Sequence, residues 1–184
     1  MNHLNTTEFE KMYNQYKLLV YNVALNYLQN IEDAEEITQD VFIQLHQSIA
    51  KFQNNSTLKT WIYRITINKC LDFIKHKNSK KRFFIFGKKS ESDFELQKTS
   101  NFEHPGILME NKEDAEILFH VINELSENQK TAFVLSKLDG LSNPEIATIM
   151  ELSISSVESL IFRAKSILKE KLSLKFENYR KKKN

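Results

Sequence analysis

Apolar residues recur every three or four positions along the first fifty residues, which is the spacing of helices with one buried face. The first run extends from Phe9 to Tyr27. A second run follows Asn30, a residue type that caps helix N-termini, and its first turns are acidic, which suits the positive end of the helix dipole. Its apolar stripe is predicted to be buried and consists of Ala34, Ile37, Val41, Leu45 and Ile49.

A third helix is predicted after the polar break at 53–56, and it extends to about His76. Its apolar residues fall on two sides, and Trp61 lies among those of one side, so we expect Trp61 in the core. Between the two sides, Arg64, Asn68 and Lys75 fall in one polar row, because residues four and seven apart return to nearly the same helical angle.

The last third of the chain carries two helix-start signals close together. Ser142 with Glu145, and Ser155 with Glu158, match the S-x-x-E capping box, in which each side chain satisfies a free backbone amide. Pro144 is tolerated in a first helical turn. We therefore expect a short helix from near 143, a break around 151–155 and a longer helix from near 156, which is a helix-turn-helix pattern.

The longer helix has an inner and an outer side. Val157, Ile161, Ala164 and Leu168 are predicted to face inward. In a helix-turn-helix, the outer residues near the start of the second helix meet base edges in the major groove. An ordinary amphipathic helix pair fits the same pattern, so periodicity alone leaves both interpretations open. The outward positions are Ser156, Ser159, Phe162, Arg163 and Ser166.

Composition favours helices throughout, because only 3 Gly and 2 Pro are available for tight turns in 184 residues. His104, Pro105 and Gly106 form the strongest turn signal. We predict an all-α fold of two helical domains joined by a flexible linker. The N-terminal domain spans 1–82, the linker 83–111, the C-terminal helix-turn-helix domain 112–175 and a basic tail 176–184.

Enzyme classes find little support in the sequence. The one cysteine, Cys70, excludes a cysteine-rich zinc site, the five histidines lack metal-ligand spacing, and no glycine-rich phosphate loop is present. We therefore expect no catalytic residue, metal or cofactor. The N-terminus lacks the pattern of a secretion signal, and no apolar run approaches the length of a membrane span. A cytoplasmic protein without stable membrane insertion is expected.

Two sets of motifs carry a family resemblance. The segments LSNPEIA at 141–147 and SVESLIFRAK at 156–165 resemble the C-terminal DNA-binding domain of extracytoplasmic-function (ECF) sigma factors of RNA polymerase. The segments DAEEITQDVF at 33–42 and TWIYRI at 60–65, with Asn68, resemble the N-terminal domain of the same family. Together they cover nearly the whole chain apart from the linker and the tail.

The resemblance implies core RNA polymerase and promoter DNA as partners, and an anti-sigma factor is common in such families. Polymerase contact, at the clamp helices of its largest subunit, is implied for Glu36, Gln39 and Asp40; without the resemblance, these would be a solvated helix face. Asn68 has a second interpretation, as a satisfied polar residue between packed helices. Recognition and opening of the minus-ten element is implied for Asn54, Asn55, Ser56, Thr57, Leu58, Arg64, Asn68 and Lys75.

The resemblance also implies binding of the C-terminal domain to a minus-thirty-five element, with one departure from the family pattern. Many relatives have Arg at the positions of Glu158 and Leu160. A carboxylate can complete a capping box, and it can also accept a hydrogen bond from cytosine N4 in the major groove. We expect an unusual sequence preference. The implied contacts are Ser156, Glu158, Ser159, Phe162, Arg163 and Ser166.

Two other functions compete with a sigma factor. One is a stand-alone helix-turn-helix regulator with an N-terminal ligand-binding or dimerisation domain. The other is a helical interaction protein without a DNA role. Transcription from a cognate promoter by core polymerase separates the first function from both.

Overall fold

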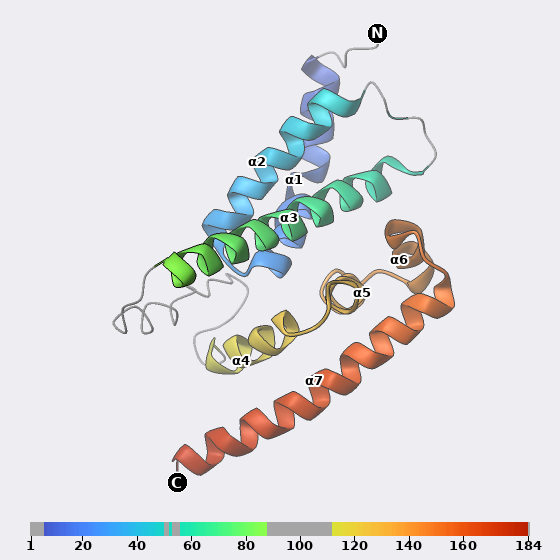
Figure 1. Ribbon diagram of the computed structural model, residues 1–184. Helices are drawn as coiled ribbons and strands as arrows, with labels where there is room; N and C mark the ends of the chain where they lie inside the picture. Colours follow the sequence, from blue (N-terminus) through green and yellow to red (C-terminus); the bar gives the residue numbers. More distant parts are fainter. Residues whose placement is uncertain (1–5, 50–51, 53–55, 88–111, 184) are drawn as a thin grey trace. The chain divides into compact units, whose positions relative to one another are not determined.

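The computed structural model describes residues 6–49, 52, 56–87 and 112–183, with side chains at 7–49, 52, 56–79 and 114–175. All regular elements within these ranges are helices (Figure 1). The chain divides into two compact units, Met1–His104 and Pro105–Asn184. These observations confirm the predicted all-α architecture with two helical domains.

The first unit consists of α1 (Thr6–Leu28), α2 (Ile31–Ser48) and α3 (Leu58–Gly87), and each helix packs against the other two. The predicted cap of α2 is present, because Asn30 Oδ1 accepts a hydrogen bond from the Asp33 amide at 2.8 Å. The predicted stripe is buried from Ala34 to Leu45, whereas Ile49 is half-buried. Full burial of such a side chain stabilises the fold by about 1.5–3 kcal/mol.

Helix α3 is longer than the sequence pattern indicated. It continues through Gly87, so residues 83–87, predicted as the start of the linker, are helical. The regularly spaced apolar residues end before His76, so the hydrophobic pattern gives no signal for the last turns of α3. The rest of the predicted linker, at 88–111, lies outside the described residues.

The second unit consists of α4 (Lys112–Asn123), α5 (Glu127–Lys137), α6 (Asn143–Met150) and α7 (Ile154–Lys183). Helix α7 packs against the other three. Its predicted inner stripe is buried, with Val157 and Ala164 fully inaccessible and Ile161 and Leu168 nearly so. This stripe anchors α7 and fixes which of its side chains face outward.

The start of α6 agrees with the prediction. The Ser142 amide donates to Glu145 Oε2 at 2.9 Å within a complete capping box, and Pro144 lies in the first turn. The helix ends at Glu151, whose φ of 57° places it in the left-handed region. That conformation reverses the chain tightly, so α7 begins soon afterwards, at Ile154.

The predicted capping box at the start of α7 is wrong. Ser153, rather than Ser155, caps the helix, because its Oγ accepts a hydrogen bond from the Ser156 amide at 3.2 Å. In a capping box, the serine pairs with the residue three positions later. That residue is acidic, Glu158, only after Ser155; after Ser153 it is Ser156. The left-handed turn at Glu151 returns the chain to helix early, so the Ser153 hydroxyl is the one next to the free amides.

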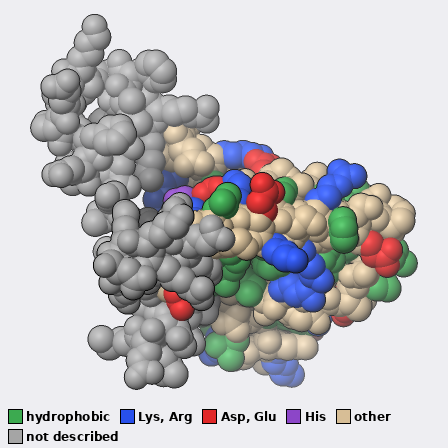
Figure 2. Space-filling model, turned by 90° about the horizontal axis from the view of Figure 1, so that it is seen from below, with side chains coloured by type: hydrophobic (Ala, Val, Ile, Leu, Met, Phe, Trp, Pro, Cys, Tyr) green, Lys and Arg blue, Asp and Glu red, His purple; other side chains and the backbone are tan. Residues whose placement is uncertain are grey.

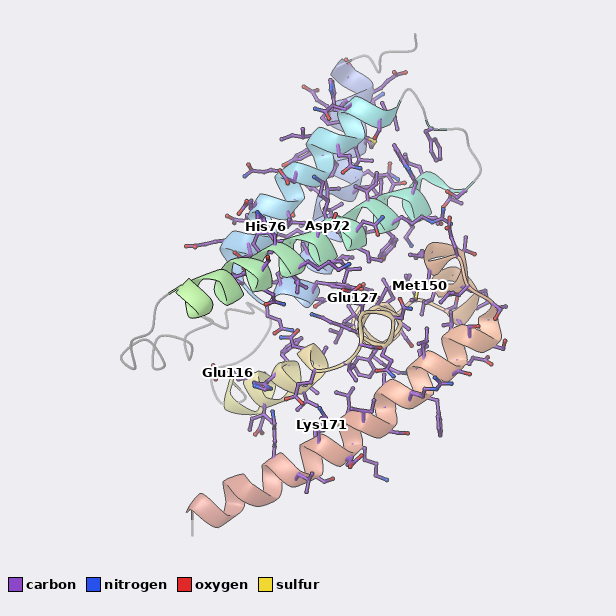
Figure 3. The ribbon with its side chains drawn as sticks, viewed as in Figure 1. Asp72, His76, Glu116, Glu127, Met150 and Lys171 are labelled. Carbon is purple, nitrogen blue, oxygen red and sulfur yellow. The ribbon has the colours of Figure 1, made fainter. Side chains whose placement is uncertain are left out.

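A cluster of charges joins α4 to α7. Glu124 pairs with Lys171 and Lys175 of α7, the latter at 3.3 Å, and with His120 one turn earlier at 2.9 Å. The Lys171 hydrogen bond is the largest cause that lowers the pKa of Glu124 from 4.5 to about 2; partial burial opposes it, and the hydrogen bond and charge of Lys175 reinforce it. The cluster connects the middle of α7, where Lys171 is marked in Figure 3, to the end of α4.

Candidate protein and nucleic-acid interfaces

The polar side of α2 is the candidate protein-binding face. Glu36 and Gln39 are exposed, as expected. Asp40 is partly covered, and its Oδ2 lies 3.5 Å from Lys69 Nζ of α3. The three predicted residues thus lie on one face within about one turn of α2. The Asp40 carboxylate also forms an ion pair with Lys69, which offsets part of its charge.

This face also carries an apolar residue, Ile43, that the sequence analysis did not predict there. Ile43 is 56% exposed and lies three and seven positions after Asp40 and Glu36, so it falls in their row. The available signal was its position off the buried stripe, because Ile43 is two residues from both Val41 and Leu45 and so lies about 160° from them around the helix. An apolar side chain within a polar ring is typical of the centre of protein interfaces.

The predicted polar row of α3 is on the surface. Asn68 and Lys75 are exposed, and Arg64 is half-buried. The alternative interpretation of Asn68, as a polar residue packed between helices, is therefore wrong. Asp72, marked on α3 in Figure 3, is also exposed one turn after Asn68. Asp72 thus places a negative charge beside the positive charges of Arg64 and Lys75.

The predicted loop at 54–58 is only partly visible, since Asn54 and Asn55 lie outside the described residues. Thr57 caps α3, because its Oγ1 accepts a hydrogen bond from the Thr60 amide at 3.1 Å. Ser56 Oγ is 3.4 Å from the Thr57 carbonyl oxygen, and Leu58 is half-buried. Thr57 thus has a structural role that the sequence analysis did not assign.

Trp61 lies at the margin of the core. It is half-buried, and its ring stacks on Phe52 with centroids 4.9 Å apart and planes 30° from parallel. The prediction of a core position is confirmed only in part. The stack connects the start of α3 to the segment before it.

The predicted outer face of α7 is exposed to solvent. All six predicted residues are exposed, and Phe162 has 71% of its surface accessible. Ser166 Oγ donates back to the Phe162 carbonyl at 3.1 Å, whereas Glu158 Oε1 accepts from Asn143 Nδ2 of α6 at 3.4 Å. A short capped helix, a left-handed turn and an exposed polar face give the geometry that enters a major groove.

On the face drawn in Figure 2, Lys and Arg side chains lie among acidic and apolar ones. Among the described residues, no three His, Cys, Asp or Glu side chains are placed to hold a metal ion. No helix in that part of the chain is long and apolar enough to cross a membrane.

Comparison with known proteins identifies two sigma-70 regions in the chain. The family model of sigma-70 region 2 matches residues 12–80, and that of sigma-70 region 4 matches residues 115–168. The ECF RNA polymerase sigma-E factor of Escherichia coli K12 is 30% identical over 149 residues, covering 76% of this chain and 74% of the relative. The corresponding factor of Haemophilus influenzae is 28% identical over 165 residues, covering 89% and 87%.

Solved structures share the fold. The sigma factor RpoE from Bartonella quintana, in complex with the anti-sigma factor NepR, has a TM-score of 0.66 at 20% identity, covering 91% of this chain and 98% of that chain. CnrH, in complex with the cytosolic domain of CnrY, has a TM-score of 0.64 at 19% identity, covering 93% and 91%.

Region 2 followed by region 4 defines a transcription initiation factor of the sigma-70 class. The chain belongs to the ECF family of RNA polymerase sigma factors, and it directs RNA polymerase to promoters. The resemblance seen in the sequence is confirmed. The two competing functions, a stand-alone regulator and an interaction protein without a DNA role, do not account for region 2.

Proposed function

We propose a division of labour between the two units of this sigma factor. The polar face of α2 docks on the clamp helices of the largest polymerase subunit. The start of α3 and its polar row engage the minus-ten element and open it, and the outer face of α7 binds the minus-thirty-five element. The observation that carries this proposal is the exposed outer face of α7, presented by a capped helix-turn-helix within the region 4 match.

The docking face is supported by exposure and composition. Glu36 and Gln39 are exposed beside Ile43, and Asp40 forms an ion pair with Lys69. Exposed ion pairs contribute only about 0–1 kcal/mol each, whereas a buried apolar anchor at an interface centre contributes more than about 1 kcal/mol. We therefore assign Ile43 as the anchor and the acidic residues as the surrounding ring that orients a basic partner.

The minus-ten role is supported by the exposed row of α3. Arg64 and Lys75 offer positive charge, and the Asn68 amide can donate to and accept from an unpaired base. The stacked pair of Phe52 and Trp61 stiffens the start of α3, where the loop residues Ser56 and Thr57 emerge. Holding bases out of the duplex at this edge would favour the opened strand.

The minus-thirty-five role is supported by the outer face of α7. Ser156 and Ser159 lie in the first turns, where base edges are reached, and Arg163 follows one turn later, where a phosphate contact is favoured. Phe162, the most exposed large apolar residue described, suits the methyl group of a thymine.

Three further features belong to the same proposal. The protein performs no catalysis of its own, because RNA synthesis is the chemistry of the polymerase. It works in the cytoplasm, where the polymerase is. An anti-sigma factor binds the chain, as NepR binds the RpoE that shares this fold.

Polymerase binding gives a direct test. Glu36→Lys should weaken the affinity for core polymerase without unfolding α2, because the side chain is exposed. Ile43→Ala should weaken it about fivefold or more, the loss of about 1 kcal/mol expected for an anchor. Titration of labelled protein with core polymerase measures both.

Leu18→Ala is the matched control, because Leu18 is also a large exposed apolar residue, 68% accessible, but lies on α1. Its affinity for core polymerase should equal that of the wild type. Unchanged affinity in both Glu36→Lys and Ile43→Ala would show that the polymerase does not bind this face of α2.

A further inference from the structure

The carboxylate of Glu158 has a different surrounding from the one its sequence context indicates. With Ser153 as the cap of α7, Glu158 does not complete a capping box. The carboxylate instead contacts α6, where Glu158 Oε1 accepts a hydrogen bond from Asn143 Nδ2 at 3.4 Å. Asn143 is the first residue of α6, directly after the Ser142 cap. The contact therefore spans the turn between the two helices.

This contact restricts a side chain that would otherwise be free to rotate. Glu158 is exposed and lies in the second turn of α7, on the flank toward the start of α6. An exposed carboxylate close to DNA phosphates is electrostatically unfavourable unless a donor satisfies it. The Asn143 amide supplies one hydrogen bond to one oxygen and leaves the second oxygen available as an acceptor.

We infer that Asn143 is a positioning residue that orients Glu158 to read an amino group on a base edge in the upstream promoter element, with cytosine N4 as the target. This inference rests on the proposed binding of α7 to the minus-thirty-five element. Cytosine presents an N4 donor in the major groove, and Glu and Asp are its acceptors among side chains. The two residues are fifteen positions apart and act as one unit.

The same unit excludes guanine and thymine. Guanine and thymine present acceptors at the corresponding position of the groove, so each would face the carboxylate oxygen without a donor between them. Leaving a desolvated acceptor unpaired costs more than the hydrogen bond gains. Glu158 thus selects cytosine in two ways: through its hydrogen bond with N4, and through the free-energy cost of facing an acceptor on guanine or thymine.

The test is a selection from randomised upstream elements with core polymerase and the full chain. Asn143→Ala and Glu158→Ala should each reduce discrimination at the same base pair, by roughly five- to tenfold. The double variant should lose no more than the larger single loss, because the two side chains act together. Glu158→Gln should change the preferred base from cytosine to adenine, which Gln reads through N6 and N7.

Thr148→Ala is the control on the same helix. It also removes one side-chain hydrogen bond, from Thr148 Oγ1 to the Pro144 carbonyl at 2.9 Å, and it should leave the preference unchanged. Circular dichroism of every variant reports folding. A role of Asn143 in stability alone would lower the melting temperature without changing the selected base.

The outcomes separate the inference from the proposed function. A changed preference in Glu158→Ala with an unchanged one in Asn143→Ala overturns the positioning role. Unchanged preferences in all variants, with an upstream element still selected, overturn the inference and leave the minus-thirty-five role in place. If the wild type selects no upstream element at all, the proposed role of α7 fails and the inference fails with it.

Discussion

At the scale of single residues, capping side chains mark where α2, α6 and α7 begin. Asn30 and Ser142 cap α2 and α6, as their sequence positions predict. The sequence does not predict the cap of α7, because Ser153 and Ser155 offer the same hydroxyl, and the backbone turn at Glu151 decides between them. A helix start depends on where the preceding turn releases the chain, and that is a property of the packed helices.

Substitution of the two serines separates these alternatives. Ser153→Ala should destabilise the second unit by about 1 kcal/mol, since it removes the acceptor for the Ser156 amide. Ser155→Ala should change the free energy of unfolding by less than about 0.5 kcal/mol, as expected for an exposed side chain without a capping role. Urea unfolding followed by circular dichroism measures both. A larger effect for Ser155→Ala would restore the capping box with Glu158.

At the scale of elements, hydrophobic periodicity predicted the buried stripes of α2 and α7 well, because a helix with one apolar stripe has only one way to bury it. It failed at the ends. Helix α3 continues through Gly87, and α7 through Lys183, both past the last regular apolar spacing. The pairing of Glu124 with Lys171 was also beyond reach, since these residues are 47 positions apart and many other charges compete as partners.

The charge cluster between α4 and α7 predicts a pH dependence. A carboxylate with a lowered pKa contributes stability above its ordinary value of 4.5, and this contribution is lost as the pH falls toward about 2. A carbon-detected NMR titration of wild type should therefore show the Glu124 carboxyl titrating near 2. Lys171→Ala should raise that midpoint toward 4.5, because it removes the largest cause of the shift. A Glu124 midpoint that is the same in both proteins would show that Lys171 does not hold it.

At the scale of the whole molecule, the two units present three surfaces that we propose as binding sites. The region 2 unit presents the polar face of α2 and the polar row of α3, and the region 4 unit presents the outer face of α7. The sequence patterns indicated these faces because exposed polar residues fall opposite buried stripes. The patterns did not indicate the ion pair of Asp40 with Lys69 or the contact of Asn143 with Glu158, since each depends on packing between helices. Ile43 was within reach of the pattern, because it lies off the buried stripe of α2.

The most direct test of the central claim is transcription by core RNA polymerase from a library of promoters randomised in both elements, with and without this chain. We predict transcripts that depend on the chain and arise from promoters sharing two sequence elements at a constant separation. Glu36→Lys should reduce their yield without changing either element. A folded chain that enriches no promoter with core polymerase would contradict its role as a sigma factor.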